Sequence, residues 1–337
     1  MKLRQLDLHD DAQFTSFYAI MRAADLYERA GMPFWSEREC AIMFRHDEPN
    51  ESWHAYAAHD GDEMVGISLM MLTLLDNTDM AFVSVAVRPE RRRHGIGSAL
   101  LAHVVEEAKA AGRTKALAET NIPFERRDDH PYRKFAEKHG FALANVEVRR
   151  VLELPVDDGL LQKWQDEAAP HHQGYRIDTF TGDIPEAILD SYVYLYNQLA
   201  LDAPTGDLDF EAEAMTPEAL RIREQKLKEM DRTVYTTVAI APDGDAVAHT
   251  NMAVSVDDRD NVYQWGTLVR RDHRGHRLGM AVKAANLRAL QRDFPDRPRI
   301  VTANSETNAP MVGINELMGF RPVELLAEFQ LKFDGTS

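Results

Sequence analysis

The feature that most constrains this chain is an internal repeat. Residues 82–101 align with residues 264–283 at an offset of 182, and each segment contains a β-favouring stretch, an Arg-rich polar turn and an amphipathic stretch. A second pair of segments, residues 137–141 and 316–320, aligns at an offset of 179. Two matches in the same order at nearly equal offsets indicate a tandem duplication, and 337 residues suit two domains of about 150 residues each.

The repeat sets the expected domain boundaries. We expect one domain over residues 1–155, hereafter copy one, and another over residues 174–337, hereafter copy two. Residues 156–173 between them are polar and contain Pro and Gly, so they are expected to be a linker. Within the linker, residues 160–164 are apolar enough to pack onto one of the domains.

The hydrophobic patterns predict a mixed α/β fold in each copy. Apolar residues recur at helical spacing near residues 14–26 and again near 188–199. Two strands follow each of these helices, over residues 54–58 and 64–70 in copy one and over residues 234–240 and 246–252 in copy two, where residues 242–245 form a hairpin turn. The predicted fold class is α/β, an α+β arrangement with a mixed sheet in each of two tandem domains.

Charge and cysteine content exclude several classes of function. With 39 Lys and Arg against 55 Asp and Glu, the net charge of -16 repels nucleic acid and anionic membrane surfaces. The single cysteine, Cys40, forms neither an internal disulfide nor a thiolate zinc site, and we expect it to be buried. The chain shows no signal-peptide pattern and no run of 18 apolar residues, so a cytoplasmic location without a membrane span is expected.

An Arg-rich turn followed by glycines and a helix is typical of a phosphate-binding cradle. In copy one, Arg91, Arg92 and Arg93 precede Gly95 and Gly97, and the next apolar residues define a helix that begins near residue 97 or 98. The first turn of a helix has unpaired N–H groups and the positive end of the helix dipole, both of which favour anions. Copy two has the same arrangement, with six basic residues before a glycine: Arg270, Arg271, His273, Arg274, His276, Arg277 and then Gly279.

A dinucleotide-binding motif is an alternative interpretation of the copy-one segment. Gly95 and Gly97 are followed by an acid, Glu119, 22 residues beyond the second glycine. However, the third glycine of that motif is replaced by Leu100, the strand is late in its domain, and copy two has no Gly-x-Gly. Nicotinamide binding is therefore disfavoured.

These residues resemble the GNAT superfamily of N-acetyltransferases, whose signature is Arg/Gln-x-x-Gly-x-Gly/Ala after the fourth strand. Residues 92–97 of copy one match this signature fully. At the same distance from the strand, residues 274–279 of copy two match it except that Arg277 replaces the first glycine. Aligning residues 276–281 instead restores the glycine but breaks the spacing, so we retain the spacing. Two such domains in one chain resemble the tandem acetyltransferases of actinobacteria, with mycothiol synthase as the architectural parallel.

The resemblance implies acetyl-CoA as the cofactor, with its pyrophosphate on the cradle and its pantetheine beside the fourth strand. The cofactor-binding residues it implies in copy one are Val85, Val87, Arg92, Arg93, His94, Gly95, Ile96, Gly97 and Ser98. Those in copy two are Leu268, Val269, Arg274, Gly275, His276, Arg277, Leu278, Gly279, Met280, Asn304 and Asn308. Because of Arg277, copy two is expected to bind the cofactor differently or less tightly than copy one.

The implied reaction is direct attack of an amine on the thioester, without a metal. The protein must then position the amine, remove its proton, polarise the carbonyl through a strand N–H and protonate the leaving thiolate. The family's usual acid is a Tyr, but Ala136 and Asn315 stand at that position. The candidate catalytic residues are Tyr132 and Glu119 in copy one and Asn315 and Glu306 in copy two, with His130 and His249 as further candidate bases.

An acidic insert distinguishes copy two. Residues 202–213 contain five carboxylates, and Asp207 and Glu211 are the candidate substrate-binding residues within it. Such a loop would attract a cationic amine, which favours copy two as the catalytic half and copy one as a second cofactor site or a scaffold.

The function expected from the sequence is an acetyl-CoA-dependent N-acetyltransferase that acts on a small-molecule amine. A non-catalytic acyl-CoA-binding sensor and a protein N-acetyltransferase remain open as alternatives. The sequence does not decide between a monomer and a homodimer.

Overall fold

The computed structural model describes residues 1–46, 50–202, 206–208 and 215–333, and it divides the chain into two compact units. Unit 1 contains the described residues up to Glu147, residues 206–208 and the residues from Glu324 onwards; unit 2 contains the rest. The sequence repeat separates the copies near residue 155, whereas the units change over at Glu147 and again at Val323. The difference arises because two long strands, β6 (Ala142–Glu153) and β12 (Arg321–Lys332), each run from one unit into the other.

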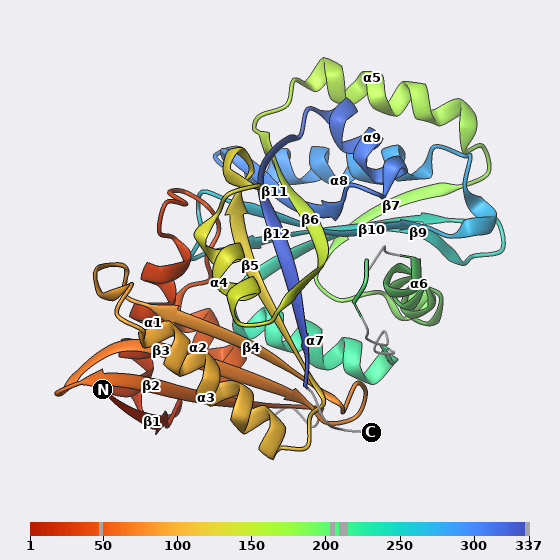
Figure 1. Ribbon diagram of the computed structural model, residues 1–337. Helices are drawn as coiled ribbons and strands as arrows, with labels where there is room; N and C mark the ends of the chain where they lie inside the picture. The colour runs from red at the N-terminus through yellow and green to blue at the C-terminus, as the bar shows by residue number, and fades with distance from the viewer. Residues whose placement is uncertain (47–49, 203–205, 209–214, 334–337) are drawn as a thin grey trace. The chain divides into compact units, whose positions relative to one another are not determined.

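Unit 1 is a mixed sheet with helices on both faces (Figure 1). Its sheet order is β1-β2-β3-β4-β5-β12, and all neighbouring strands are antiparallel except β4 and β5. The elements are β1 (Lys2–Leu6), α1 (Asp11–Asp25), α2 (Glu37–Arg45), β2 (Glu51–Asp60), β3 (Glu63–Thr73), β4 (Met80–Val87), α3 (Ile96–Ala110), β5 (Lys115–Pro123) and α4 (Pro131–Lys138), with short 3-10 turns at Pro89–Arg91 and Phe124–Arg126.

Alternation along β3 explains the two helical layers of unit 1. Ile67 and Leu69 pack with Phe14 and Phe17 of α1, whereas Met70 lies in a cluster with residues of α3 on the opposite face. The two faces are therefore both apolar, as is expected of a sheet covered on both sides. The predicted early helix and the predicted strand pair of copy one are confirmed.

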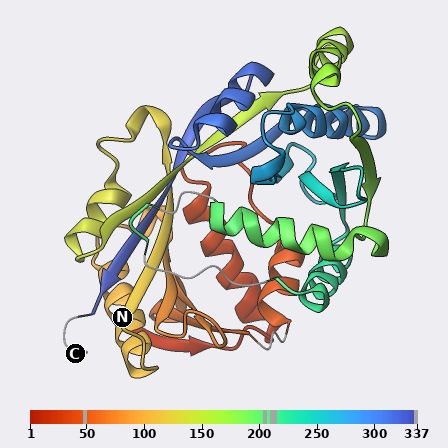
Figure 2. The ribbon, with the colours of Figure 1, turned by 90° about the vertical axis from the view of Figure 1, so that its right-hand side faces the viewer.

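Unit 2 repeats this plan with the sheet order β6-β11-β10-β9-β8-β7. Its elements are α5 (Asp158–Ala168), β7 (Arg176–Thr181), α6 (Leu189–Asp202), α7 (Pro217–Glu229), β8 (Arg232–Ile240), β9 (Ala246–Ser255), β10 (Val262–Val269), α8 (Leu278–Asp293), β11 (Arg299–Ser305) and α9 (Ala309–Met318), with short 3-10 turns at Ala169–His171, Glu186–Ile188 and Arg271–His273. Helix α8 covers one face of the sheet and α6 the other, as the side view shows (Figure 2). The predicted mixed α/β fold and the hairpin at residues 242–245 are confirmed.

The linker does not form a free tether. Most of it is helix α5, in which Leu161 and Trp164 are buried in the same cluster as Leu287 and Leu290 of α8. The expectation that residues 160–164 pack onto a domain is therefore confirmed.

The end of the chain completes the sheet of unit 1. Residues Glu324–Lys332 of β12 pair with Pro123–Lys115 of β5 in unbroken antiparallel register. At the start of this segment, Arg29 donates from Nε and Nη2 to the two carboxylate oxygens of Glu324, each at 2.7 Å, and both side chains are 3% exposed. The two-pronged geometry of this buried ion pair fixes where β12 begins to pair.

Candidate active site

The two Arg-rich turns have the same backbone shape despite their different residues. In copy one, Arg93 and Gly95 have positive φ angles of 68° and 79°. In copy two, Gly275 and Arg277 take the matched positions with φ angles of 90° and 50°. Arginine thus replaces glycine at a left-handed position in each turn, which confirms the alignment by spacing from the strand.

A shared hydrogen bond fixes the first arginine of each signature. Arg92 Nε donates to the carbonyl of Val87 at 3.3 Å, and Arg274 Nε donates to the carbonyl of Val269 at 3.2 Å. The guanidinium carbon of Arg92 also lies 4.5 Å from the ring centroid of Tyr27, which is 44% exposed. The first arginine of each signature therefore closes the turn onto its strand.

The copy-one turn leads into an open helix N-terminus. A Cβ added at Gly95 would meet no atom within 4 Å, and the N–H groups of the first turn of α3 have no intrahelical partner. Gly97 allows close packing, because a Cβ there would lie 3.5 Å from Phe135 and 3.6 Å from Val87. His94 Nδ1 lies 2.7 Å from the Arg92 carbonyl and Ser98 Oγ 3.0 Å from His139 Nε2, while Ile96 is buried.

The cations of the copy-two turn bind groups of their own unit. Asp202 pairs with Arg271 at 2.5 Å and with Arg274 at 2.6 Å, and these bonds lower the pKa of Asp202. Arg277 donates to the Glu167 carbonyl at 3.1 Å, and His276 Nδ1 lies 2.9 Å from the His171 carbonyl. The end of the linker therefore lies against this turn.

The first turn of α8 is tightly packed. A Cβ at Gly279 would lie 3.0 Å from Ile314. Leu278 is buried in a cluster with residues of β8 and β9, whereas Met280 packs against the core cluster that Ile314 also contacts. Gly279 therefore allows α8 to approach its neighbours closely.

In each copy, two parallel strands pair and then separate. The register of β4 with β5 ends at Phe82 and Leu117, and that of β10 with β11 ends at Tyr263 and Val301. The N–H groups of Arg88 and Arg270 donate to β3 and β9 respectively. In an antiparallel strand, the backbone N–H and C=O groups of one residue point to one side of the strand and those of the next residue point to the other side.

This alternation determines which backbone groups face the gap between the separated strands. In copy one they belong to Val85 and Val87, as expected. In copy two they belong to Thr267 and Val269, whereas Leu268 is paired towards β9 and its side chain is buried with α6. Thr267 thus occupies the position for which the sequence analysis named Leu268.

A β-bulge distinguishes β10 from β4. Gln264 pairs with Met252 and Thr267 pairs with Thr250, so that Trp265 and Gly266 together face one residue of β9. The β3–β4 register, in contrast, is unbroken from Gly66 to Leu72. A Cβ at Gly266 would come within 2.4 Å of Leu199, so the bulge requires glycine there.

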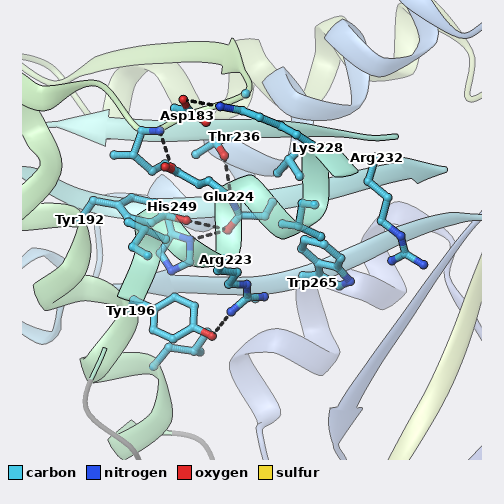
Figure 3. A pocket seen from close by; sticks show the side chains of 18 residues that line it. Asp183, Tyr192, Tyr196, Arg223, Glu224, Lys228, Arg232, Thr236, His249 and Trp265 are labelled. Atoms are coloured by element: carbon cyan, nitrogen blue, oxygen red, sulfur yellow. Dashed lines mark hydrogen bonds and ion pairs between the residues drawn. The ribbon is translucent and has the colours of Figure 1, made fainter. Parts of the chain in front are cut away.

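The bulge lines a pocket in unit 2 (Figure 3). The pocket has a cavity volume of about 140 Å³, close to the roughly 150 Å³ cavity that accommodates a benzene molecule. Helices α6 and α7, strands β8, β9 and β10 and the loop after β7 supply its polar and aromatic lining: Asp183, Tyr192, Tyr196, Arg223, Glu224, Lys228, Arg232, Thr236, His249, Asn251 and Trp265.

His249 is the buried titratable group of this pocket. Its Nδ1 lies 2.9 Å from Asn251 Oδ1, which also accepts from Tyr192 Oη at 3.2 Å, while Asn251 Nδ2 donates to Thr236. Nδ1 must therefore carry the proton, and Nε2 keeps its lone pair. Nε2 is buried and makes no hydrogen bond with any described residue. Burial lowers the pKa of His249 to about 4, so the ring is neutral at pH 7.

The charged residues of the pocket differ in how they are paired. Lys228 binds Asp183 at 2.7 Å, and Glu224 accepts from Arg221 at 2.7 Å. Arg223 instead donates to the hydroxyl of Tyr196 and stacks between aromatic rings.

Copy one has no equivalent set of side chains among its described residues. In the strand registers, Ile67 and Leu69 match His249 and Asn251. Both are buried in an apolar cluster with residues of α1. The chemistry that the pocket offers is therefore specific to copy two.

Asn315 lies in a separate buried network of copy two. Its Oδ1 accepts from Lys283 at 3.0 Å, and its Nδ2 donates at 3.0 Å to Asn304 Oδ1, which also accepts from Arg150. Glu306, 64% exposed, lies 3.6 Å from Arg150 at the end of this network. Asn304 is thus occupied by protein partners, and Asn308 caps α9 by accepting from the Met311 N–H at 3.4 Å.

The remaining candidates are not among the residues that line the pocket. In copy one, the ring centroid of Tyr132 lies 5.5 Å from the guanidinium carbon of Arg92, and burial raises the pKa of Tyr132. Burial lowers the pKa of His130, and Glu119 is exposed on β5. Asp207 is exposed in unit 1, where its N–H binds the Ala144 carbonyl. Glu211 lies outside the described residues.

Comparison with known families decides the class of the domain. Residues 16–141 match the model of the Acetyltransferase (GNAT) family. The N-terminal copy is a GNAT acetyltransferase domain. No curated protein matches the sequence. Across the described residues, no helix combines the length and apolarity that a membrane span requires.

Solved structures extend the GNAT fold to the whole chain. A tandem GNAT protein from the clavulanic acid biosynthesis pathway matches with a TM-score of 0.75 and 23% identity, covering 100% of this chain and 99% of that one. A GCN5-related N-acetyltransferase from Sphaerobacter thermophilus matches with a TM-score of 0.66 and 14% identity, covering 98% and 95%. The tandem GNAT architecture predicted from the repeat is confirmed.

The sequence analysis named His249 but did not predict the pocket around it. A signal was present in β9, where three polar residues, His249, Thr250 and Asn251, interrupt a strand whose ten residues are all buried. Buried polar groups in a central strand need partners, and those partners mark a site. Arg223 and Trp265 gave no such local signal.

Proposed function

We propose that the protein is an acetyl-CoA-dependent N-acetyltransferase that acetylates a small-molecule amine, and that copy two carries the reaction. The observation that carries this proposal is the buried, unbonded Nε2 of neutral His249 in a pocket lined by the β10 bulge. The GNAT domain of copy one and the GNAT fold of the whole chain support acyl transfer as the class of reaction.

The residues of both cradles fit acetyl-CoA. In copy one, the open space at the N-cap Gly95, where an added Cβ meets nothing within 4 Å, leaves room for phosphate oxygens beside the N–H groups of α3; in copy two Arg277 takes the N-cap position, and the open glycine, Gly275, precedes it. The peptide groups of Val85 and Thr267 and the N–H groups of Val87 and Val269 face the gap and are proposed to bind the amides of pantetheine, while the carbonyls of Val87 and Val269 accept from Arg92 and Arg274. When bound, acetyl-CoA supplies the acetyl group as a thioester.

His249 is proposed as the general base. Its Nε2 lone pair accepts a proton from the ammonium or amine of the acceptor. Asn251 holds the ring in the required tautomer, and Tyr192 and Thr236 hold Asn251. This arrangement gives the base a fixed direction before the acceptor binds.

The bulge is proposed to serve the carbonyl group. Trp265 and Gly266 lie outside the paired register of β10, and a backbone N–H of this bulge is proposed to polarise the carbonyl oxygen. The glycine at position 266 also lets the chain pass close to His249, since a Cβ there would lie 3.7 Å from the ring.

Copy one is proposed as a second cofactor site or a scaffold. It has the full signature turn, but Ile67 and Leu69 fill the place of the base and its positioning residue. Copy one therefore has no histidine at the position of His249 to act as the base.

The test is acetyl transfer to a panel of small amines, followed by release of free CoA thiol. We expect His249→Gln to lower kcat by about 100-fold or more while calorimetric binding of acetyl-CoA is retained. The exposed His9 serves as the matched control in His9→Gln. If the wild-type protein binds acetyl-CoA but acetylates no amine, the enzyme proposal fails and a non-catalytic acyl-CoA-binding protein takes its place.

A further inference from the structure

We propose that the amine acceptor carries a carboxylate, and that Arg223 binds it. The inference rests on the proposed function, since it describes the molecule that would occupy the pocket beside His249. The acceptor class it assigns is a small amino acid or another aminocarboxylate.

The first argument is the position of Arg223. It lies on α7 and lines the same pocket as His249 on β9 (Figure 3). Its guanidinium carbon is 5.3 Å from the ring centroid of Tyr196 and 5.5 Å from that of Trp265. Stacking on two rings fixes the plane of the guanidinium and leaves N–H groups to donate in that plane.

The second argument is charge. The acids that line the pocket already have partners, because Asp183 holds Lys228 and Glu224 holds Arg221 and the Ile184 N–H. Arg223 makes no ion pair within the part of the chain that the structure describes, where its side-chain bond is to the neutral hydroxyl of Tyr196. A half-buried cation without an acid partner favours an anionic ligand.

The third argument is the surrounding field. A chain with a net charge of -16 repels anions in general, so a carboxylate needs a local cation to bind. Of the described carboxylates of the acidic insert, Asp202 is paired with Arg271 and Arg274, and Asp207 belongs to unit 1 and does not line the pocket. The acids that line the pocket thus leave Arg223 without an ion-pair partner among the described residues.

The fourth argument is size. A cavity of about 140 Å³ suits a molecule of a few heavy atoms beyond its amine. An amine directed at His249 and a carboxylate at Arg223 would place the acceptor between an Nε2 that bonds no described residue and a guanidinium whose described hydrogen bond is to a neutral hydroxyl. A guanidinium is suited to a carboxylate because its parallel N–H groups match the two oxygens.

The experiment compares matched acceptors in the full-length protein. The pairs are β-alanine with β-alaninamide, 4-aminobutanoate with 4-aminobutanamide, and lysine with cadaverine, each assayed for CoA release from acetyl-CoA. We expect at least one carboxylate member to have a kcat/KM about 10- to 100-fold above its carboxylate-free partner, the difference that hydrogen bonds to a charged group supply.

Variants then assign the preference to Arg223. Arg223→Met should abolish the difference in kcat/KM between the paired acceptors, mainly by raising KM for the carboxylate, and should change turnover of the carboxylate-free amine little. Arg223→Lys should retain part of the preference for the carboxylate. Arg176→Met removes an equal charge from a side chain that is 69% exposed, and it controls for the overall field. A structural role for Arg223 would instead lower turnover of both members equally.

A second readout separates this inference from the proposed function. Binding of the same carboxylates is followed by tryptophan fluorescence in the wild type, Arg223→Met and Trp265→Phe. Carboxylates that quench the wild type but not Arg223→Met, with no turnover of any amine, would keep the anion site and refute the acetyltransferase. Turnover that ignores the carboxylate, or a preference that survives in Arg223→Met, would refute the carboxylate site and keep the enzyme.

Discussion

Replacing Lys283 by methionine should change how the stability of the protein depends on pH. Lys283 lies on α8, 1% exposed, with its Nζ bonded to Asn315 Oδ1 at 3.0 Å. Burial lowers the pKa of this lysine to about 7 from an ordinary value near 10.5. Between these values the unfolded chain binds more protons than the folded chain, so the stability contributed by this site rises with pH.

The size of the effect follows from the two pKa values. At 1.36 kcal/mol per unit, the cost of burying Lys283 is about 4 kcal/mol at pH 7.5 and about 1.4 kcal/mol at pH 9.5. The wild type should therefore gain about 2.5 kcal/mol over this range relative to Lys283→Met. The range ends at pH 9.5 because the pKa values of Tyr56 and Tyr192 are raised to about 12, which reverses the trend above pH 10.

The assay is urea unfolding of unit 2 at pH 7.5, 8.5 and 9.5, followed by near-ultraviolet circular dichroism. Lys163→Met is the control, since its side chain on α5 is 66% exposed. Its free energy of unfolding should follow the wild type at every pH. Parallel pH profiles for the wild type and Lys283→Met would show that Lys283 stays charged in the folded protein and would refute the reasoning.

Three further predictions concern packing and the cradle. Arg29→Met removes the bidentate partner of the buried Glu324 carboxylate, and thermal unfolding should show a loss of about 3–5 kcal/mol that Glu324→Gln in the same chain partly restores. Gly279→Ala forces a methyl group to within 3.0 Å of Ile314, so it should cost about 1–3 kcal/mol in urea unfolding, and an unchanged midpoint would contradict the packing argument. Gly95→Glu places a carboxylate at the copy-one cradle, and calorimetry should show one acetyl-CoA site fewer than in the wild type; loss of all binding would contradict independent sites.

The repeat made the fold predictable because both copies keep the same number of residues between a strand and the helix that follows it. This number can be read from the sequence, and it allowed both signature turns to be located even where Arg277 replaces glycine. Local patterns likewise predicted the burial of Cys40 and the packing of Leu161 and Trp164, since each depends on hydrophobicity alone.

The pocket was less predictable because it joins residues that are far apart in the sequence. Arg223 and Trp265 are 42 positions apart, and nothing near either residue signals the other. The acidic insert attracted attention as a cluster, yet Asp202 serves to hold two arginines of the cradle turn. Composition identifies charges, whereas only the fold shows which of them are already neutralised.

The path of β6 and β12 bears on how such a chain arose and how it can be divided. Each copy ends in a strand that completes the sheet of the other unit, as two identical subunits would if they exchanged their last strands before their genes fused. Cutting the chain at residue 155 would give halves that each lack one sheet edge and carry a surplus strand. Such halves would be expected to aggregate when made separately and to recover when made together, so neither copy is an autonomous module.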